Sequence, residues 1–282
     1  MAIQLGENRY GESGVRLLRV VKQEGRHDIK EMTLDIRFEG DFEEAHARGE
    51  NRSILPADTM KNTVYILARQ YPVEAIEEFC LHMADHFLTY NPQVTRVLVG
   101  ASETLWTRVP LGAKPHPSTF VRAGEEKRTA TLDGTREETT IRSGIDNLVV
   151  LKTTNFAFED FRRDPYTTLK DSRNLLLSAV IRADWLYESE DIEFGPIWHG
   201  VRKTLLENFA EHDSRSLQNT LFAMGEAVLS TFDNIKEIHI SLMDKDCRLA
   251  DLEPFGMDNP AEVFLLSDEQ HGLIEAKVRK TQ

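Results

Sequence analysis

The spacing of apolar residues changes from period two to period 3.6 and back, and this succession occurs twice along the 282-residue chain. Residues 32–38 alternate apolar and polar side chains, which is typical of a strand with one buried face. Residues 76–90 place apolar side chains three and four positions apart, on one face of a helix. The sequence therefore predicts an α+β fold made of two ββααββ units, residues 1–143 and residues 144–282.

Each unit is expected to contain two strands, two helices and then further strands. In the first unit we expect strands at 15–21 and 32–38, helices at 59–69 and 76–90, and strands at 94–99, 105–109, 120–122, 128–132 and 139–143. In the second unit we expect strands at 147–152 and 175–185, helices at 197–209 and 217–232, and strands at 235–242, 263–266 and 273–278.

An antiparallel sheet with two helices on one face leaves its other face and its edges without a partner. Association of several chains is the simplest way to cover these surfaces. A ring of such units has no free sheet edge, as in closed barrels. We therefore expect an oligomer that closes its sheets into a barrel.

The charge balance excludes one class of partner. The chain has 34 Lys and Arg residues against 47 Asp and Glu residues, and its formal net charge is −13. Nucleic-acid binding needs a basic stripe, so we expect no nucleic-acid partner. Cys80 and Cys247 match no metal or redox spacing, which predicts free thiols in a reducing compartment. With no signal peptide and no membrane span in the sequence, we expect a cytoplasmic protein.

Six segments in order resemble the urate oxidase (uricase) family: YGESGVRLLRV, ILPADTMKNTVY, KPHPSTFVR, NFAFEDFRRDPYTTLKD, SRSLQNTLFAMGE and AEVFLLSDEQHGLIEAKV. The resemblance implies the tunnelling fold, in which each chain contributes two units and four chains stack into a barrel. It also implies a homotetramer with its sites between subunits, and oxidation by O₂ as co-substrate with no metal and no organic cofactor.

The resemblance also implies which residues bind the substrate. Phe158 matches the phenylalanine that stacks on the planar ring, and Gln218 matches the glutamine that pairs with the amide edge of the ring. Leu217 stands for the adjacent apolar residue, and Asp58 matches the residue whose backbone amide faces the ligand.

Five positions depart from the family pattern. Glu12, Ala57 and Asp246 stand where the family has the lysine, threonine and histidine of its proton relay. Asp244 replaces an amide that helps to hold dioxygen, and Leu175 falls on the arginine that clamps urate. Urate binds as an anion, so the exchange of a guanidinium for carboxylates argues against urate itself and favours a ring with N–H groups. Two carboxylates held close together raise the pKa of one of them, which provides a general acid or base.

We therefore predict a uricase-like oxidase that acts with O₂ on a planar purine-like heterocycle. Glu12, Asp244 and Asp246 are its expected acid and base groups. An acid-base or hydrolytic enzyme for a purine- or pterin-like ring, and a barrel without catalysis, are the alternatives. His82 and His86 have the i, i+4 spacing of metal ligands, but no third ligand is evident and we expect no metal.

Overall fold

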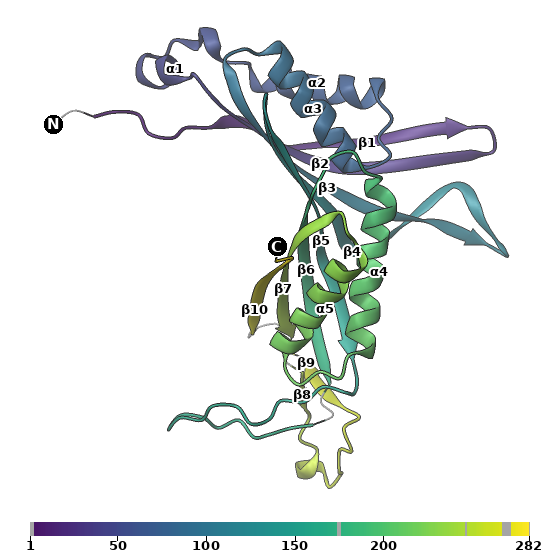
Figure 1. Cartoon of the computed structure of the whole chain (residues 1–282). Coiled ribbons are helices and arrows are strands. Elements are labelled where there is room, and N and C mark those ends of the chain that lie inside the picture. Colours follow the sequence, from purple (N-terminus) through teal and green to yellow (C-terminus); the bar gives the residue numbers. More distant parts are fainter. Residues whose placement is uncertain (1–2, 174–175, 246, 267–271, 282) are drawn as a thin grey trace. The chain divides into compact units, whose positions relative to one another are not determined.

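The computed structural model describes residues 3–173, 176–245, 247–266 and 272–281 (Figure 1). The chain forms two compact units. The first unit contains residues 1–144 and 186–198, and the second contains residues 145–185 and 199–282. That the chain is a duplication of one unit, with halves at 1–143 and 144–282, stays a prediction.

The first unit begins with the predicted hairpin. Strand β1 (Tyr10–Gln23) pairs antiparallel with strand β2 (Arg26–Gly40), and Gln23 lies opposite Arg26. The turn needs a left-handed residue, and Gly25 supplies it with φ of +72°. In β2 the apolar residues of the alternating stretch are fully buried, as their period predicted.

The hairpin continues into three long strands, β3 (Val94–Leu111), β4 (Lys114–Thr135) and β5 (Thr139–Lys152). The sequence predicted this region as six short strands, so the predicted breaks at 100–104, 123–127 and 144–146 are wrong, and the predicted break at 110–119 is only the two-residue turn at 112–113 between β3 and β4. Much of the distal part of β3 and β4 is exposed, so polar residues occupy both faces and no alternation shows where the strands run. Within the first unit, β1, β2, β3, β4 and β5 are neighbours in that order.

Helices cover one face of this sheet. Helix α2 (Ala57–Gln70) packs against β1, and helix α3 (Ile76–Tyr90) packs against β3 and β4 (Figure 1). Both helices were predicted. A short helix α1 (Glu43–Arg48) and a 3₁₀ turn η1 (Asn51–Ser53) precede them and were not predicted, because neither buries any residue.

The second unit repeats the arrangement with β6 (Leu177–Tyr187), helices α4 (Phe194–Glu211) and α5 (Leu217–Thr231), and strands β7 (Ile235–Lys245) and β10 (Leu273–Arg279). Here β5, β6, β7 and β10 are neighbours in that order, and α5 packs on β7 and β10. The predicted strand at 263–266 lies instead in a separate small sheet, where β9 (Phe264–Leu266) pairs with β8 (Cys247–Leu249) beside the 3₁₀ turn η2 (Glu253–Phe255).

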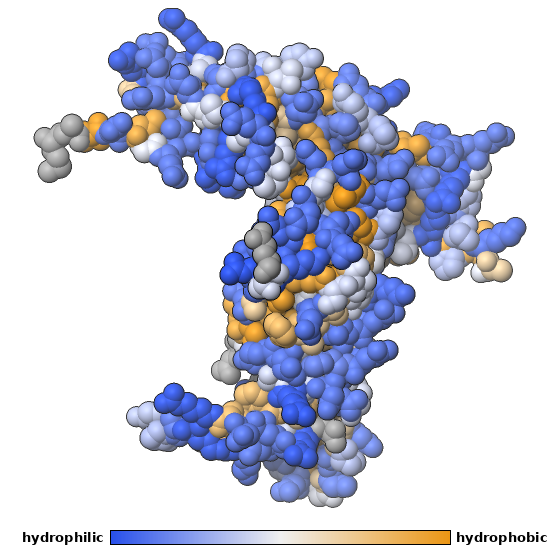
Figure 2. All heavy atoms as spheres, viewed as in Figure 1, coloured by the Kyte–Doolittle hydropathy of each residue, from blue (hydrophilic) through white to orange (hydrophobic). Residues whose placement is uncertain are grey.

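The predicted α+β fold, with antiparallel sheets covered by helices on one face, is confirmed. None of the helices in the described part of the chain combines the length and apolar character that a membrane span needs. Figure 2 shows a mostly hydrophilic surface on which apolar residues gather near α5, β7 and β10. Phe222, Met243 and Leu273 are exposed members of these three elements.

Candidate active site

The first turn of α2 contains two of the expected site residues, Ala57 and Asp58, and both are exposed. The Asp58 carboxylate contacts its own helix: Lys61 Nζ lies 2.6 Å from Oδ1, and Asn62 Nδ2 donates to Oδ2 at 3.1 Å. The hydrogen bond from Lys61 is the main cause that lowers the pKa of Asp58. The backbone amides of a first helical turn have no acceptor within the helix, so the Asp58 amide is suited to face a ligand.

Glu12 lies on β1 beside this turn. A bulge between Glu12 and Val15 shifts the register, and Gly14, with φ of +71°, donates its N–H to Asp35 Oδ1 at 3.0 Å. The pKa of Lys61 is raised mainly by its hydrogen bond to Asp58, and the charge of Glu12 adds to that rise. Glu12 on β1 and Lys61 on α2 are therefore close enough for their charges to interact, and the catalytic role expected for Glu12 stays a prediction.

Phe158 is held in a short bridge after β5. Its N–H donates to Ser172 O at 2.9 Å, and Ser172 N–H donates back to Phe158 O at 3.0 Å. The ring of Phe161 stacks on Phe158 with centroids 4.9 Å apart and planes 10° apart, and Arg163 lies 4.6 Å from the centroid of Phe161. Phe161 thus covers one face of the half-buried Phe158 ring, and the other face is the one suited to a planar ligand.

Gln218 is the second residue of α5, and its side chain is exposed, whereas the neighbouring Leu217 is buried. The helix is capped by Ser216, whose Oγ accepts the N–H of Asn219 at 3.1 Å. Since Ser216 provides the cap, the helix does not need Gln218 for that purpose.

Backbone hydrogen bonds connect the Phe158 segment to the residues before α5. Ala157 N–H donates to Ser214 O at 2.8 Å, and Ser214 N–H donates to Asn155 O at 3.1 Å. A pocket of about 480 Å³ lies at this junction and is lined by Asn155, Phe156, Ala157, Glu159, Asp160, Arg173, Asp213 and Arg215. Phe158 and Gln218 thus belong to segments that meet, although neither lines the pocket itself.

Of the three remaining predicted site residues, the structure describes only Asp244. Asp244 is half-buried near the end of β7, where its N–H donates to Gly272 O at 2.8 Å. Leu175 and Asp246 lie outside the described residues. The expected cluster of Glu12, Asp244 and Asp246 therefore stays a prediction.

The histidine pair on α3 is occupied by aromatic contacts. His82 stacks on Tyr71 with centroids 4.2 Å apart, and His86 packs on Tyr90 at 4.7 Å. Burial lowers the pKa of His86. In the ranges that the structure describes, no three His, Cys, Asp or Glu side chains gather as a metal site would require.

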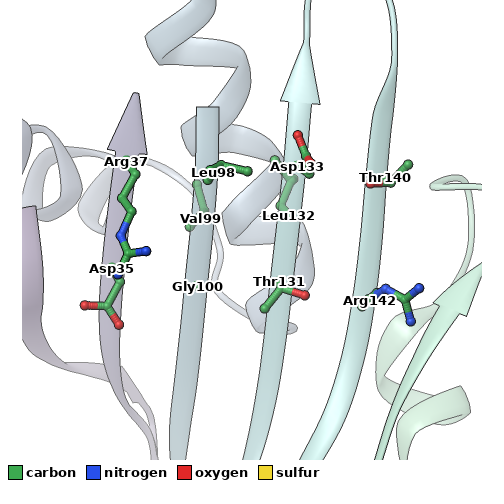
Figure 3. A pocket seen from close by; sticks show the side chains of 10 residues that line it. All are labelled: Asp35, Arg37, Leu98, Val99, Gly100, Thr131, Leu132, Asp133, Thr140 and Arg142. Carbon is green, nitrogen blue, oxygen red and sulfur yellow. The ribbon is translucent and has the colours of Figure 1, made fainter. Parts of the chain in front are cut away.

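A second cavity of about 480 Å³ opens on the face of the first unit's sheet that the helices leave uncovered (Figure 3). Figure 3 shows Asp35 and Arg37 on β2, Thr131 on β4 and Arg142 on β5 around the bare backbone of Gly100. The alternation of these polar residues with buried apolar ones indicates an exposed face of the sheet but gives no sign of a cavity there. Its polar lining lets this face contact water without an apolar partner.

The family model named Uricase matches residues 8–133 and 141–275 of this chain. The uricase of Arthrobacter globiformis is 40% identical over 278 residues, which cover 99% of this chain and 90% of the relative. The uricase of Aspergillus flavus is 34% identical over 289 residues, which cover 97% of this chain and 96% of the relative.

Solved structures of uricases are also similar to this chain. The crystal structure of the uricase from Arthrobacter globiformis matches with a TM-score of 0.95 at 39% identity, over 99% of this chain and 96% of that one. A uricase from Bacillus fastidious, 20% identical, shares the fold with a TM-score of 0.84 over 96% of this chain and 93% of its own. The family model and these relatives span nearly the whole sequence, and the chain therefore belongs to the uricase family of oxidases.

Proposed function

We propose that this protein oxidises a planar purine-like heterocycle with O₂, without a metal or an organic cofactor, at sites shared between the subunits of a homotetramer. The observation that carries the proposal is the junction of the Phe158 segment with the start of α5. There the ring of Phe158, backed by Phe161, and the exposed amide of Gln218 belong to hydrogen-bonded neighbouring segments. A ring stacked on Phe158 can hydrogen-bond to Gln218 along its edge.

The proposed tetramer follows from the sheet edges. In the described part of the chain β1 pairs only with β2, and β10 pairs only with β7. β1 also exposes Leu18, Val20 and Val21. Open edges with apolar side chains favour pairing with another copy of the chain.

Urate is the first substrate to test, because the relatives at 30–40% identity are named uricase. The proposed acid and base groups are Glu12, Asp244 and Asp246, with Ala57 and Leu175 completing an altered pocket wall. Carboxylates accept hydrogen bonds from N–H groups and repel an anionic ring. We therefore expect slower turnover of urate than of a neutral ring with more N–H groups.

The experiment is O₂ uptake with urate, xanthine and guanine by the wild type and two variants. Loss of stacking in Phe158→Ala should raise the KM for the substrate at least about fivefold, since base-aromatic stacking contributes about 1–3 kcal/mol. Phe255→Ala, a matched change at an exposed phenylalanine of η2, should leave KM unchanged. An unaltered KM in Phe158→Ala would remove Phe158 from the site. Loss of the ring without O₂ uptake would favour the hydrolytic alternative.

A further inference from the structure

Lys152, the last residue of β5, is a buried lysine with 8% of its surface exposed. Its Nζ donates to Phe209 O at 3.4 Å and also to His212 O. Burial lowers the pKa of Lys152, and the charge of Asp213 acts in the opposite direction. The carbonyl groups in the last turn of a helix have no donor within the helix and attract a cation. Lys152 therefore caps the carboxyl end of α4 from β5 and fixes the turn that follows the helix.

This turn, residues 212–216, contacts the segment that contains Phe158. Ser214 lies within the turn and forms both backbone hydrogen bonds to Asn155 and Ala157, at 3.1 and 2.8 Å. Phe158 is the next residue along the chain. Movement of the turn would therefore move the stacking ring.

The same turn also fixes the start of α5. The Nε2 atom of His212 donates to Asn219 Oδ1 across 3.0 Å, and Ser216 Oγ accepts the N–H of Asn219. Gln218 lies between Ser216 and Asn219 in the sequence. The position of the Gln218 side chain therefore also depends on the turn at 212–216.

We propose that Lys152 is a positioning residue for the substrate ring. By fixing the turn at 212–216, it sets the Phe158 ring and the Gln218 amide in register with each other. The inference rests on the proposed function, in which these two side chains hold the ring. Binding that needs two contacts at a set distance and angle weakens sharply when either contact can drift.

The chain provides a matched control. Lys280 Nζ donates to Phe232 O and Asp233 O, each at 3.0 Å, at the end of α5. This is the same contact of a lysine with two carbonyl groups, but it lies at the opposite end of α5 from Gln218, about 20 Å away at 1.5 Å per helical residue. Lys280 is exposed, whereas Lys152 is buried, so Lys280→Met removes a more exposed contact of the same kind without touching the turn at 212–216.

The experiment compares Lys152→Met with Lys280→Met in the full-length protein. Three methods are used: calorimetry gives the Kd for urate without O₂, O₂ uptake gives kcat and KM, and hydrogen exchange reports on the amides of Ala157 and Ser214. Lys152→Met should weaken binding and raise KM at least about tenfold, with a smaller change in kcat, and should speed exchange at both amides. Lys280→Met should lower Tm and leave all of these values within about twofold.

Unchanged binding in Lys152→Met, or equal weakening in Lys280→Met, would overturn the inference. If Lys152→Met does not fold, His212→Leu decides, since it removes only the contact to Asn219. It should weaken urate binding at least about threefold and leave the Ala157 exchange rate unchanged. No change in binding there would also overturn the inference. If the wild type does not bind urate, urate is not its substrate, and hydrogen exchange in Lys152→Met still decides whether Lys152 fixes the Phe158 segment.

Discussion

Ala57 begins α2, and Glu12 on β1 lies close enough for its charge to act on Lys61 of that helix; the resemblance to uricases places a threonine and a lysine at these two positions. Residue identity at such positions could be compared with the family from the sequence alone. The role of Lys152 could not, because a single lysine at the end of an apolar run gives no sign of the carbonyl groups that it meets. The contacts of Lys152 with these carbonyl groups depend on how the end of α4 packs against β5, and that packing is set by the tertiary structure.

The first prediction concerns the proton relay. Glu12→Lys combined with Ala57→Thr should raise kcat for urate at least about tenfold, because positioned acid-base groups contribute about 10²–10⁴-fold. Steady-state O₂ uptake measures the change. Glu24→Lys makes the same change of charge in the exposed hairpin turn and should have no effect. A double variant no faster than the wild type would show that Glu12 does not occupy a relay position.

The second prediction concerns the two thiols. Burial, and to a smaller extent the charge of Glu77, raises the pKa of the Cys80 thiol, and Glu77 is itself paired in the core with Arg128. The thiolate is the reactive form, so at pH 8 a disulfide reagent should modify Cys247 in the native protein and Cys80 only after unfolding. Native Cys247→Ser should therefore show almost no labelling. Equal rates at both cysteines would contradict the packing around α3.

Among the elements, the hairpin and the four long helices follow from the sequence because each buries one regular apolar face. Of the distal parts of β3 and β4 the sequence predicted only fragments, at 105–109 and 120–122, since these parts cover no core and carry polar residues on both faces. The strand at 263–266 was predicted correctly as extended, but its partner β8 is a three-residue segment with no pattern of its own. Pairing between such short strands is set by the loops around them.

The third prediction tests how closely α5 approaches β10. A Cβ on Gly225 would meet Val278 Cγ2 at 2.6 Å, so Gly225→Ala should lower the free energy of unfolding by about 1–3 kcal/mol through overpacking. A Cβ on Gly195 in α4 would meet nothing within 4 Å, and Gly195→Ala should be neutral or slightly stabilising. Urea denaturation measures both. Equal effects of the two substitutions would show that α5 does not lie as close to β10 as the structure has it.

For the whole molecule, the sequence predicts an assembly because open sheet edges need partners. The number of copies comes only from the family resemblance. We predict that four copies of the 32.2 kDa chain sediment together at about 129 kDa. Leu18→Lys combined with Val20→Lys on the edge strand β1 should produce smaller species and abolish turnover, since the proposed sites are shared between subunits. Phe255→Lys, at an exposed residue of η2, should leave the assembly intact. An active monomer would contradict a shared site.

The most direct test of the central claim follows O₂ and the heterocycle in the same sample of wild-type protein, with a chelator present and no cofactor added. We predict that an oxygen electrode and the ultraviolet absorbance of the ring record proportional loss of both for urate or another purine of the panel. Disappearance of the ring at constant O₂, or no reaction with any purine, would contradict the account.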